Sequence, residues 1–316
     1  MIVDALDWQP TAALQRLNLP WLQDAGVEAA ILRLRLDLID SLISGNKWFK
    51  LSEHLTQAVE AGAEGLISLG GAHSNHLHAL AAAGKRFGFP TVGLLRGHAQ
   101  QTPTVLDLQA FGMQLHWLGY AGYRARHAAD FWLPWQTQYP ELYPIAEGGG
   151  GLAGALGCAR LREMVDSQLG HLGWDDYHGW WLAVGTGTTL AGLLLAEAGA
   201  HPVYGAMAVP GDHGVAQNIV AVLKEATGSQ VNASPNLPAA CVLLEASRGG
   251  FARTDAALLD FIASSEAHSG IPLEPLYTGK ALLALHDEVL AGRFKSGSRL
   301  VLVHTGGLQG RRAMGL

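Results

Sequence analysis

Two lysines stand three residues apart in the segment Gly45-Asn46-Lys47-Trp48-Phe49-Lys50-Leu51. Lys47 lies between a Gly-Asn turn and two aromatic residues, which is an unusual setting for a side chain that normally lies in solvent. A lysine amine can form a Schiff base with a carbonyl cofactor, and a second lysine can bind an anion. The simpler interpretation is a loop-to-helix junction that carries two surface charges.

A glycine- and threonine-rich segment, Gly185-Thr186-Gly187-Thr188-Thr189, follows a buried-type strand and precedes a helical pattern. Glycines let the backbone approach a phosphate, and the first N–H groups of a helix point at it. The segment is not a Walker A loop, because no Gly-Lys-Ser/Thr follows, and Leu190 replaces the third glycine of a dinucleotide fingerprint. A phosphate monoester fits it better than either nucleotide, although a helix cap without a ligand has the same pattern.

A third polar segment, Gly70-Gly71-Ala72-His73-Ser74-Asn75-His76, ends a short apolar strand and begins an alanine-rich helix. Ser-Asn at a helix start is first of all an N-cap, but at the carboxyl end of a strand it can also face a ligand. The histidines could indicate a metal site. No acidic or thiol ligand lies near them in the sequence, so capping is the better interpretation and no metal is expected.

Two further segments stand near the end of the chain, Leu276-Tyr277-Thr278-Gly279-Lys280 and His304-Thr305-Gly306-Gly307. By themselves they could be a half-buried helix cap and an ordinary glycine-rich turn. Together with the segments above, they add an aromatic acid/base to a reactive amine and a phosphate cradle. Pyridoxal phosphate is the cofactor that requires these three groups.

The elements that must position these residues are short strands that alternate with helices. Strands are predicted over 27–38, 65–69, 91–95, 113–117, 143–146, 180–184, 203–209, 239–244 and 299–304. Helices are predicted over 51–61, 76–87, 103–110, 121–132, 152–169, 190–198, 215–226, 254–267 and 280–291. This alternation indicates an α/β fold of parallel βα units with helices on both sheet faces, and ligands bind at the carboxyl ends of such strands.

Composition limits the possible classes of protein. The chain has 316 residues, 49% of them hydrophobic and 15% charged, with a formal net charge of −6. It can bury a large core, and it lacks the basic patch of a nucleic-acid-binding protein. No apolar run is long enough for a membrane span, and no signal peptide is evident. Two cysteines without a motif spacing indicate a reducing compartment, so we expect a cytoplasmic protein without a nucleic-acid or membrane partner.

The chain resembles the fold-type II pyridoxal-phosphate enzymes of the 1-aminocyclopropane-1-carboxylate deaminase and D-cysteine desulfhydrase family. The resemblance covers most of the chain and rests on the order and spacing of Ser44-Gly45-Asn46-Lys47, Gly70-Gly71 through Ser74-Asn75-His76, the threonine-glycine loop, Glu274 through Lys280, and His304-Thr305-Gly306-Gly307. It implies two open, twisted, mainly parallel α/β domains, similar to tryptophan synthase β, with the cofactor in the cleft between them. Residues 1–50 and 150–316 would form the large domain and residues 51–149 the small one. It also implies a homodimer that acts on a small amino acid.

Residue roles carry over from this resemblance by position. Lys47 would hold the cofactor through a Schiff base, Asn75 would bind its 3′ oxygen, and Thr278 would lie at its pyridine nitrogen. The other cofactor contacts would come from Lys50, Gly185, Thr186, Gly187, Thr188, Thr189 and Thr305. The substrate would contact Ser74, Asn75, His76, Phe251 and Tyr277. Lys47, Ser74 and Tyr277 would be the catalytic residues.

Two positions distinguish the reactions within this family. The cyclopropane deaminases carry a glutamate beside the tyrosine and a leucine after the histidine of His-x-Gly-Gly, where this chain has Thr278 and Thr305. A carboxylate keeps the pyridine nitrogen protonated, which suits ring opening, whereas a hydroxyl leaves a weaker electron sink. A weaker sink suffices for a good β leaving group. The threonines therefore favour an α,β-elimination similar to that of D-cysteine desulfhydrase, which gives pyruvate, ammonia and sulfide.

Other functions stay open at this point. Phe251 falls about where the family has a second active-site tyrosine, and the missing hydroxyl affects the identity of the substrate. The first alternative is 1-aminocyclopropane-1-carboxylate deaminase. A non-catalytic homologue that binds pyridoxal phosphate or another small molecule is an alternative from a different class. A dinucleotide-dependent oxidoreductase would use the loop at 185–192, but it leaves Lys47 without a role.

Overall fold

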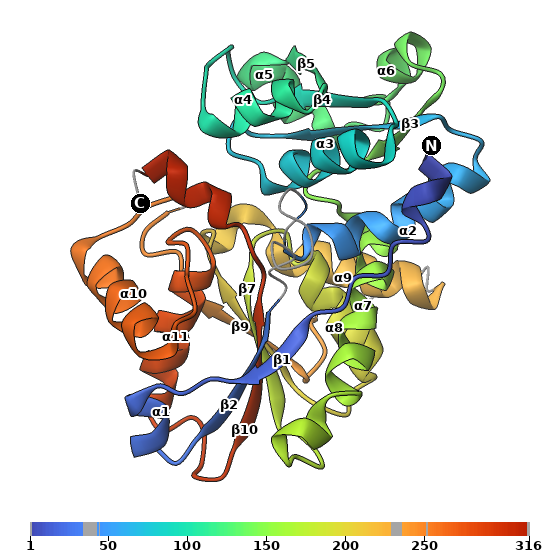
Figure 1. Cartoon of the computed structure of the whole chain (residues 1–316). Coiled ribbons are helices and arrows are strands. Elements are labelled where there is room, and N and C mark those ends of the chain that lie inside the picture. Colours follow the sequence, from blue (N-terminus) through green and yellow to red (C-terminus); the bar gives the residue numbers. More distant parts are fainter. Residues whose placement is uncertain (1, 34–42, 44, 229–235, 251, 315–316) are drawn as a thin grey trace.

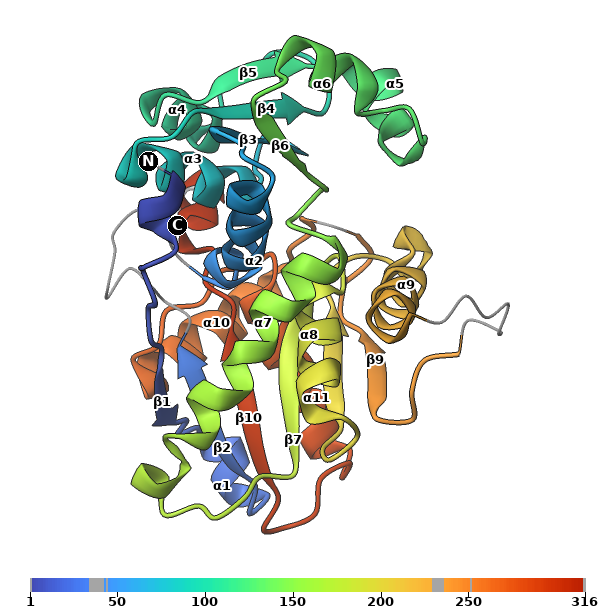
Figure 2. The same ribbon diagram turned by 90° about the vertical axis from the view of Figure 1, so that its right-hand side faces the viewer.

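The computed structural model of the chain describes residues 2–33, 43, 45–228, 236–250 and 252–314. In this part of the chain the strands form one six-stranded and one four-stranded sheet, which lie one above the other in Figure 1. Helix α2 (Lys47–Glu60) lies at the boundary between them (Figure 2). The N-terminal 3-10 helix η1 (Ile2–Ala5) packs against α2.

The large sheet has the strand order β1-β2-β10-β7-β8-β9, and all neighbouring pairs except β1 and β2 are parallel. Its strands are β1 (Ala13–Arg16), β2 (Glu28–Arg33), β7 (Gly179–Val184), β8 (Val203–Met207), β9 (Cys241–Glu245) and β10 (Arg299–His304). Along β7, Trp180 and Trp181 belong to hydrophobic clusters on opposite faces of the sheet. A sheet that is covered on both faces needs such continuous apolar strands.

Helices cover both faces of the large sheet (Figure 1). One layer consists of α7 (Gly151–Asp166), α8 (Thr188–Glu197) and α9 (Val215–Thr227), and the other of α1 (Pro20–Asp24), α10 (Ala256–Ser269) and α11 (Thr278–Leu290). The 3-10 helices η4 (Leu169–Leu172), η5 (Gly211–His213) and η6 (Leu308–Met314) lie in the connections. None of the described helices is both long and apolar enough to cross a lipid bilayer.

The small sheet is wholly parallel, with the strand order β5-β4-β3-β6. Its strands are β3 (Gly65–Gly70), β4 (Thr91–Leu95), β5 (Gln114–Trp117) and β6 (Leu142–Ile145). Its helices are α3 (Asn75–Phe87), α4 (Pro103–Ala110), α5 (Gly119–Arg124) and α6 (Leu133–Gln138), with the 3-10 helix η3 (Ala125–His127). One hydrophobic cluster contains both Leu66 of β3 and Trp180 of β7, so the two sheets share a continuous core.

The alternation of strands and helices predicted from the sequence is confirmed. The structure adds β1 and α1, which were not predicted, and it corrects one predicted helix. The strand predicted over 27–38 is described over Glu28–Arg33, and the rest of that prediction lies outside the described part of the chain. The single helix predicted over 121–132 is wrong, because α5 ends at Arg124 and α6 begins only at Leu133. Glycine at 119 and 122 weakens the first helix, and a proline in the first turn favours a new start for the second.

The domain boundaries at residues 50 and 150 stay a prediction. The strands of the small sheet all fall within 51–149, and those of the large sheet all fall outside that range. The first boundary falls inside α2, which packs against α7 as well as against α3. The contact with α7 is close, since a Cβ atom at Gly157 would lie 1.9 Å from the carbonyl oxygen of Phe49.

Candidate active site

A cavity of about 1020 Å³ opens at the carboxyl ends of strands from both sheets. Gly70 ends β3, Glu147 and Gly148 follow β6, Gly185 follows β7, and Thr305 follows β10. Ligands of open parallel sheets bind at this end of the strands, because the loops there leave a crevice. The cavity is therefore the candidate active site.

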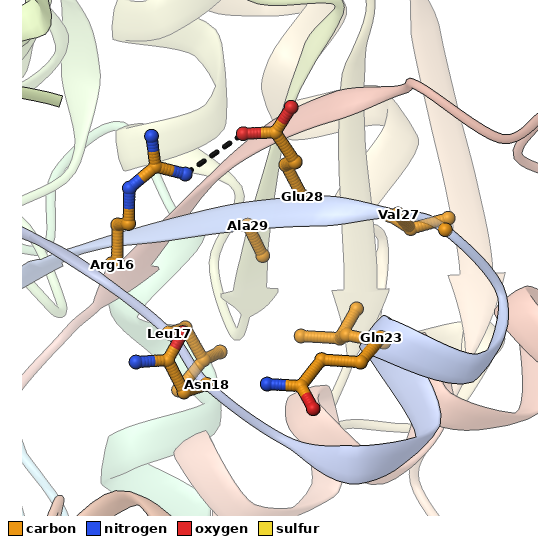
Figure 3. Close-up of a pocket in the computed structure, with 9 residues that line it drawn as sticks. Arg16, Leu17, Asn18, Gln23, Val27, Glu28 and Ala29 are labelled. Atoms are coloured by element: carbon orange, nitrogen blue, oxygen red, sulfur yellow. Dashed lines mark hydrogen bonds and ion pairs between the residues drawn. The ribbon is translucent and has the colours of Figure 1, made fainter. Parts of the chain in front are cut away.

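A second, smaller hollow of about 350 Å³ lies near the opposite end of the large sheet, beside the first residues of β2 (Figure 3). Its charged side chains pair with each other, since Arg16 donates to Glu28 over 2.8 Å. Trp174 also donates to Glu28, over 2.8 Å. The two charged groups of this hollow are thus paired without a ligand.

The two lysines of the opening segment lie on the first turn of α2. Gly45 has φ 77°, and a Cβ atom there would lie 2.2 Å from the carbonyl oxygen of Thr305, so only glycine fits. The N–H of Asn46 donates to the same oxygen over 3.1 Å, which fixes the start of α2 on the loop after β10. Lys50 is buried, and Lys47 is partly exposed to the cavity.

Burial favours the neutral form of both lysines. Burial, together with the nearby charge of Lys50, lowers the pKa of Lys47 to about 7. Burial also lowers the pKa of Lys50. In the described part of the chain no carboxylate forms an ion pair with either amine. An amine with a pKa near 7 is a usable nucleophile and base at neutral pH.

The start of α8 forms an anion cradle next to Lys50. The helix has no side-chain cap, and the N–H groups of residues 188–190 have no acceptor within the helix. Lys50 Nζ lies 3.5 Å from Thr186 Oγ1 and 3.2 Å from the carbonyl oxygen of Gly148. Free N–H groups at a helix N-terminus beside a cation are typical of phosphate sites.

The three threonines of the cradle use their hydroxyl groups in two ways. Thr186 and Thr188 share a hydrogen bond of 3.0 Å at the cavity wall. The hydroxyl oxygen of Thr189 instead accepts a hydrogen bond from Asn46 Nδ2 over 2.8 Å. Thr189 can therefore contribute a backbone N–H to an anion while its side chain holds Asn46.

The wall formed by the small sheet carries Ser74, Asn75 and His76 at the start of α3. Ser74 is the N-cap, and its Oγ accepts a hydrogen bond from the N–H of Leu77 over 3.2 Å. This leaves its hydroxyl proton free to donate. Asn75 Oδ1 accepts a hydrogen bond from Gln309 of η6 over 3.0 Å, which joins the last 3-10 helix to this wall.

His76 is neutral and has a defined tautomer. Burial lowers its pKa well below the ordinary value, and the two lysines add to this effect. Ser68 donates its proton to the carbonyl oxygen of Ile145 over 2.8 Å, so His76 Nε2 must be the donor in its 2.8 Å contact with Ser68 Oγ. His76 Nδ1 is then an acceptor, and it is buried without a partner in the described structure.

Tyr277 lies beside the anion cradle at the start of α8. A Cβ atom at Gly185 would lie 3.2 Å from its ring, so the tyrosine packs directly on the loop. Buried Glu274 fixes the local backbone, because its carboxylate accepts hydrogen bonds from the N–H groups of Leu276, Tyr277 and Thr278 over 2.6 to 2.8 Å. Burial and the charge of Glu274 raise the pKa of Tyr277, so its hydroxyl stays protonated at neutral pH.

The structure brings most of the predicted site residues to one cavity. These are Lys47, Lys50, Ser74, Asn75, His76, Gly185, Thr186, Gly187, Thr188, Thr189, Tyr277 and Thr305. Thr278 does not line it. Its hydroxyl is enclosed by Glu274, with its oxygen 2.9 Å from the Glu274 N–H and 3.2 Å from the Glu274 carbonyl oxygen. Phe251 lies outside the described residues.

Several wall residues were missed by the sequence-based prediction. Asn46 lines the cavity beside Lys47, and the small-sheet side contributes Arg96, Tyr120, Tyr123, Arg124, Arg126 and Glu147. Arg96 directly follows β4, and Glu147 comes two residues after β6. Ser74 was selected because ligands bind at the carboxyl ends of parallel strands, and the same argument could have selected Arg96 and Glu147. No comparable signal marks the residues of α5 and η3.

Fold and site together define an enzyme that binds a phosphorylated cofactor beside a reactive amine, and the chain belongs to the family of pyridoxal-phosphate-dependent enzymes. The model of that family matches residues 9–306. A protein of Pyrococcus furiosus, provisionally named 1-aminocyclopropane-1-carboxylate deaminase, is 30% identical over 90% of this chain and 86% of its own length. The bifunctional D-cysteine desulfhydrase/1-aminocyclopropane-1-carboxylate deaminase of Arabidopsis thaliana, a mitochondrial protein, is 27% identical over 94% of this chain and 76% of its own.

A solved structure shows the same fold. The crystal structure of a homologue of 1-aminocyclopropane-1-carboxylate deaminase superimposes with a TM-score of 0.78. It is 24% identical, and the match covers 99% of this chain and 98% of that one. The predicted family, the fold-type II architecture and the cofactor are thereby confirmed.

The residues around the cavity fit pyridoxal phosphate. The free N–H groups of α8 and the Lys50 ammonium are donors for a phosphate monoester, and Lys47 supplies a neutral amine for an aldehyde. The wall behind Lys50 is bare backbone, because a Cβ atom at Gly149 would lie 3.1 Å from Lys50 Cβ and 3.3 Å from His76 Nδ1. The Lys50 ammonium, the Lys47 amine and the start of α8 thus face the same cavity.

Proposed function

We propose that this enzyme catalyses the α,β-elimination of a small amino acid, as D-cysteine desulfhydrase does, and releases a 2-oxo acid, ammonia and the β substituent. Lys47 holds the cofactor covalently in this proposal, and Lys50 with the N-terminus of α8 binds its phosphate. Asn75 and Thr305 complete the cofactor site. The proposal draws on the names of the relatives, which include both a desulfhydrase and a cyclopropane deaminase.

One observation favours elimination over ring opening. Glu147 is the only carboxylate among the described residues that line the cavity, and it is already bound by Tyr123 over 2.5 Å and Arg126 over 2.7 Å. The Glu274 carboxylate is used by three backbone N–H groups. A cavity without a free carboxylate gives little support to a protonated pyridine nitrogen. Such a site suits a substrate whose β substituent leaves readily.

The chemistry can be divided among three side chains. Pyridoxal phosphate, when bound, withdraws electrons from the α-carbon of an amino acid attached through its amine. Once the incoming amino acid has freed it, the Lys47 amine can accept the α proton, since its pKa lies near 7. The Ser74 hydroxyl donates to the substrate carboxylate, and the protonated hydroxyl of Tyr277 donates to the departing sulfur. The carbon–sulfur electron pair leaves with the sulfur, and water then converts the remaining enamine to a 2-oxo acid and ammonia.

A substrate panel tests this proposal. We expect 2-oxo acid release from D-cysteine or β-chloroalanine and little or none from 1-aminocyclopropane-1-carboxylate. L-cysteine and the Lys47→Ala variant serve as controls for chirality and for background chemistry. Turnover of the cyclopropane amino acid alone would contradict the elimination mechanism and favour the deaminase. A protein that binds the cofactor without converting any member of the panel would be a non-catalytic homologue.

Uptake of the cofactor should depend on pH with a midpoint near 7. The attacking form of Lys47 is the neutral amine, and its pKa is lowered to about 7. We expect the rate at which cofactor-free protein incorporates pyridoxal phosphate to rise from pH 6 and to level off above about pH 8. Stopped-flow absorbance would follow it, with Lys47→Met as the control that forms no borohydride-stable link. A rate that still rises steeply between pH 8 and 10 would mean that Lys47 titrates as an ordinary lysine.

A homodimer and a cytoplasmic location remain part of the proposal. Size-exclusion chromatography with light scattering and cell fractionation would test them.

A further inference from the structure

Three buried side chains from different helices form a hydrogen-bonded chain behind Lys47. Lys47 Nζ donates to Asn46 Oδ1 over 2.6 Å, and Asn46 Nδ2 donates to Thr189 Oγ1 over 2.8 Å. Cys158 Sγ of α7 donates to the same hydroxyl oxygen over 3.7 Å. Asn46, Thr189 and Cys158 are 5%, 4% and 0% exposed, so water does not compete for these bonds.

The direction of each bond follows from the chemistry of the groups. The Lys47 amine donates to the amide oxygen in both its charged and its neutral form, and the NH₂ group of Asn46 then faces Thr189. A hydroxyl oxygen has two acceptor sites, and here Asn46 and Cys158 fill both. The Thr189 side chain therefore holds the carboxamide in one of its two possible orientations.

We propose that Thr189 and Cys158 are positioning residues for Lys47, which act by fixing the Asn46 carboxamide with its oxygen toward the amine. The proposal rests on the function given to Lys47 above. A neutral amine that donates one N–H to Asn46 has its lone pair directed away from Asn46. The fixed amide thereby restricts where the base can accept a proton.

The arrangement also affects the protonation of Lys47. An amide oxygen stabilises the ammonium form, whereas an amide NH₂ group in the same place would repel it. Burial lowers the pKa of Lys47, whereas an amide oxygen 2.6 Å from its Nζ favours the protonated form. Loss of the Thr189 acceptor would let the amide rotate, and the amine would then lose its proton more readily.

Thr189→Val is the direct test, because valine keeps the shape and the backbone N–H but cannot accept a hydrogen bond. Thr189→Ser restores the hydroxyl. Cys158→Ala removes the second donor, and Cys241→Ala removes the other buried free cysteine and is the matched control. The pH dependence of Lys47 acetylation in cofactor-free protein, followed by mass spectrometry, reports the amine directly.

We expect Thr189→Val to move the midpoint of Lys47 acetylation down by roughly half a pH unit or more, and Thr189→Ser to restore it. In the loaded enzyme kcat should fall about fivefold with KM little changed, because one hydrogen bond is worth about 1 kcal/mol. Cys158→Ala should shift the midpoint in the same direction by less, and Cys241→Ala should not shift it.

The outcomes separate this inference from the proposed function. A wild-type acetylation profile in both Thr189→Val and Cys158→Ala would overturn the positioning role, whatever the activity. The positioning role would also fail if Thr189→Val only lowered the melting temperature, because a purely structural contact leaves the Lys47 titration unchanged. If the midpoint shifts as expected but the wild-type enzyme converts no amino acid, the positioning role holds and the proposed reaction fails.

Discussion

Lys47→Met should abolish turnover and, at the same time, make the cofactor-free protein more stable. The wild-type amine has a pKa near 7 in the folded chain, against 10.5 for an ordinary lysine. The unfolded chain therefore holds a proton that the folded chain releases, and this difference costs about 4 kcal/mol of stability near pH 7. Methionine has a similar length and no charge, so it avoids the cost.

The stability gained by the Lys47→Met variant should depend on pH. Below pH 7 both states of the wild-type protein are protonated at Lys47, and the full cost is present. Between pH 7 and 10.5 the cost falls steadily, because folding releases the Lys47 proton in this range and the release costs less free energy as the pH rises. Above pH 10.5 the amine is neutral in both states and the cost is gone. Urea unfolding of the cofactor-free proteins at pH 6.5 and pH 9 would measure it. Lys295→Met, which changes an exposed lysine, is the control, and equal stabilities of the two variants at pH 6.5 would contradict the argument.

Glu274→Ala should be the most damaging change outside the cavity wall. Its carboxylate is the acceptor for three backbone N–H groups at the start of α11, and the side chain is 1% exposed. Each buried donor left without an acceptor costs about 1 to 3 kcal/mol, so a loss of roughly 4 kcal/mol is expected. The turn that presents Tyr277 would also relax, and kcat should fall.

Glu274→Gln is the matched variant for this test. Its amide oxygen can still accept two of the three hydrogen bonds, and it removes a charge whose burial raises the pKa of Glu274. We expect it to lie within about 1 kcal/mol of the wild type in urea unfolding. If the alanine variant were as stable as the glutamine variant, the three N–H groups would have found other partners and the argument would fail.

The parallel strands and the convergence of their loops could be predicted from the sequence alone. Continuous apolar runs such as that of β7 mark strands buried on both faces, and the polar residue after each such strand must then lie at the carboxyl edge. The same rule brought Ser74 and Thr305 to the cavity. The different roles given to Lys47 and Lys50, which lie one helical turn apart, came from the resemblance to a known family and stay a prediction.

Hydrogen-bond partners could not be predicted in this way. The Thr189 hydroxyl meets Asn46, which is 143 positions away in the chain, and no local pattern marks such a pair. Thr278 was expected at the cofactor ring because of its place beside Tyr277. Its hydroxyl instead closes on Glu274, since the backbone turns sharply enough there for the carboxylate to cap it. The position of a residue in the sequence indicates which segment it lies in. Which hydrogen-bond donors and acceptors pair with each other depends on the folded structure.

In the described part of the chain Lys47 and Lys50 form no ion pair with a carboxylate, and this has a practical consequence for measurements on the protein. In the proposed cofactor site, Lys50 and the free N–H groups of α8 bind the phosphate group by charge and geometry, so inorganic phosphate or sulfate from a buffer would occupy the same donors. A bound anion stabilises the protein that binds it in proportion to the logarithm of its concentration. Apparent cofactor affinities and melting temperatures will therefore vary with the buffer anion. Comparisons between variants need a buffer free of both anions.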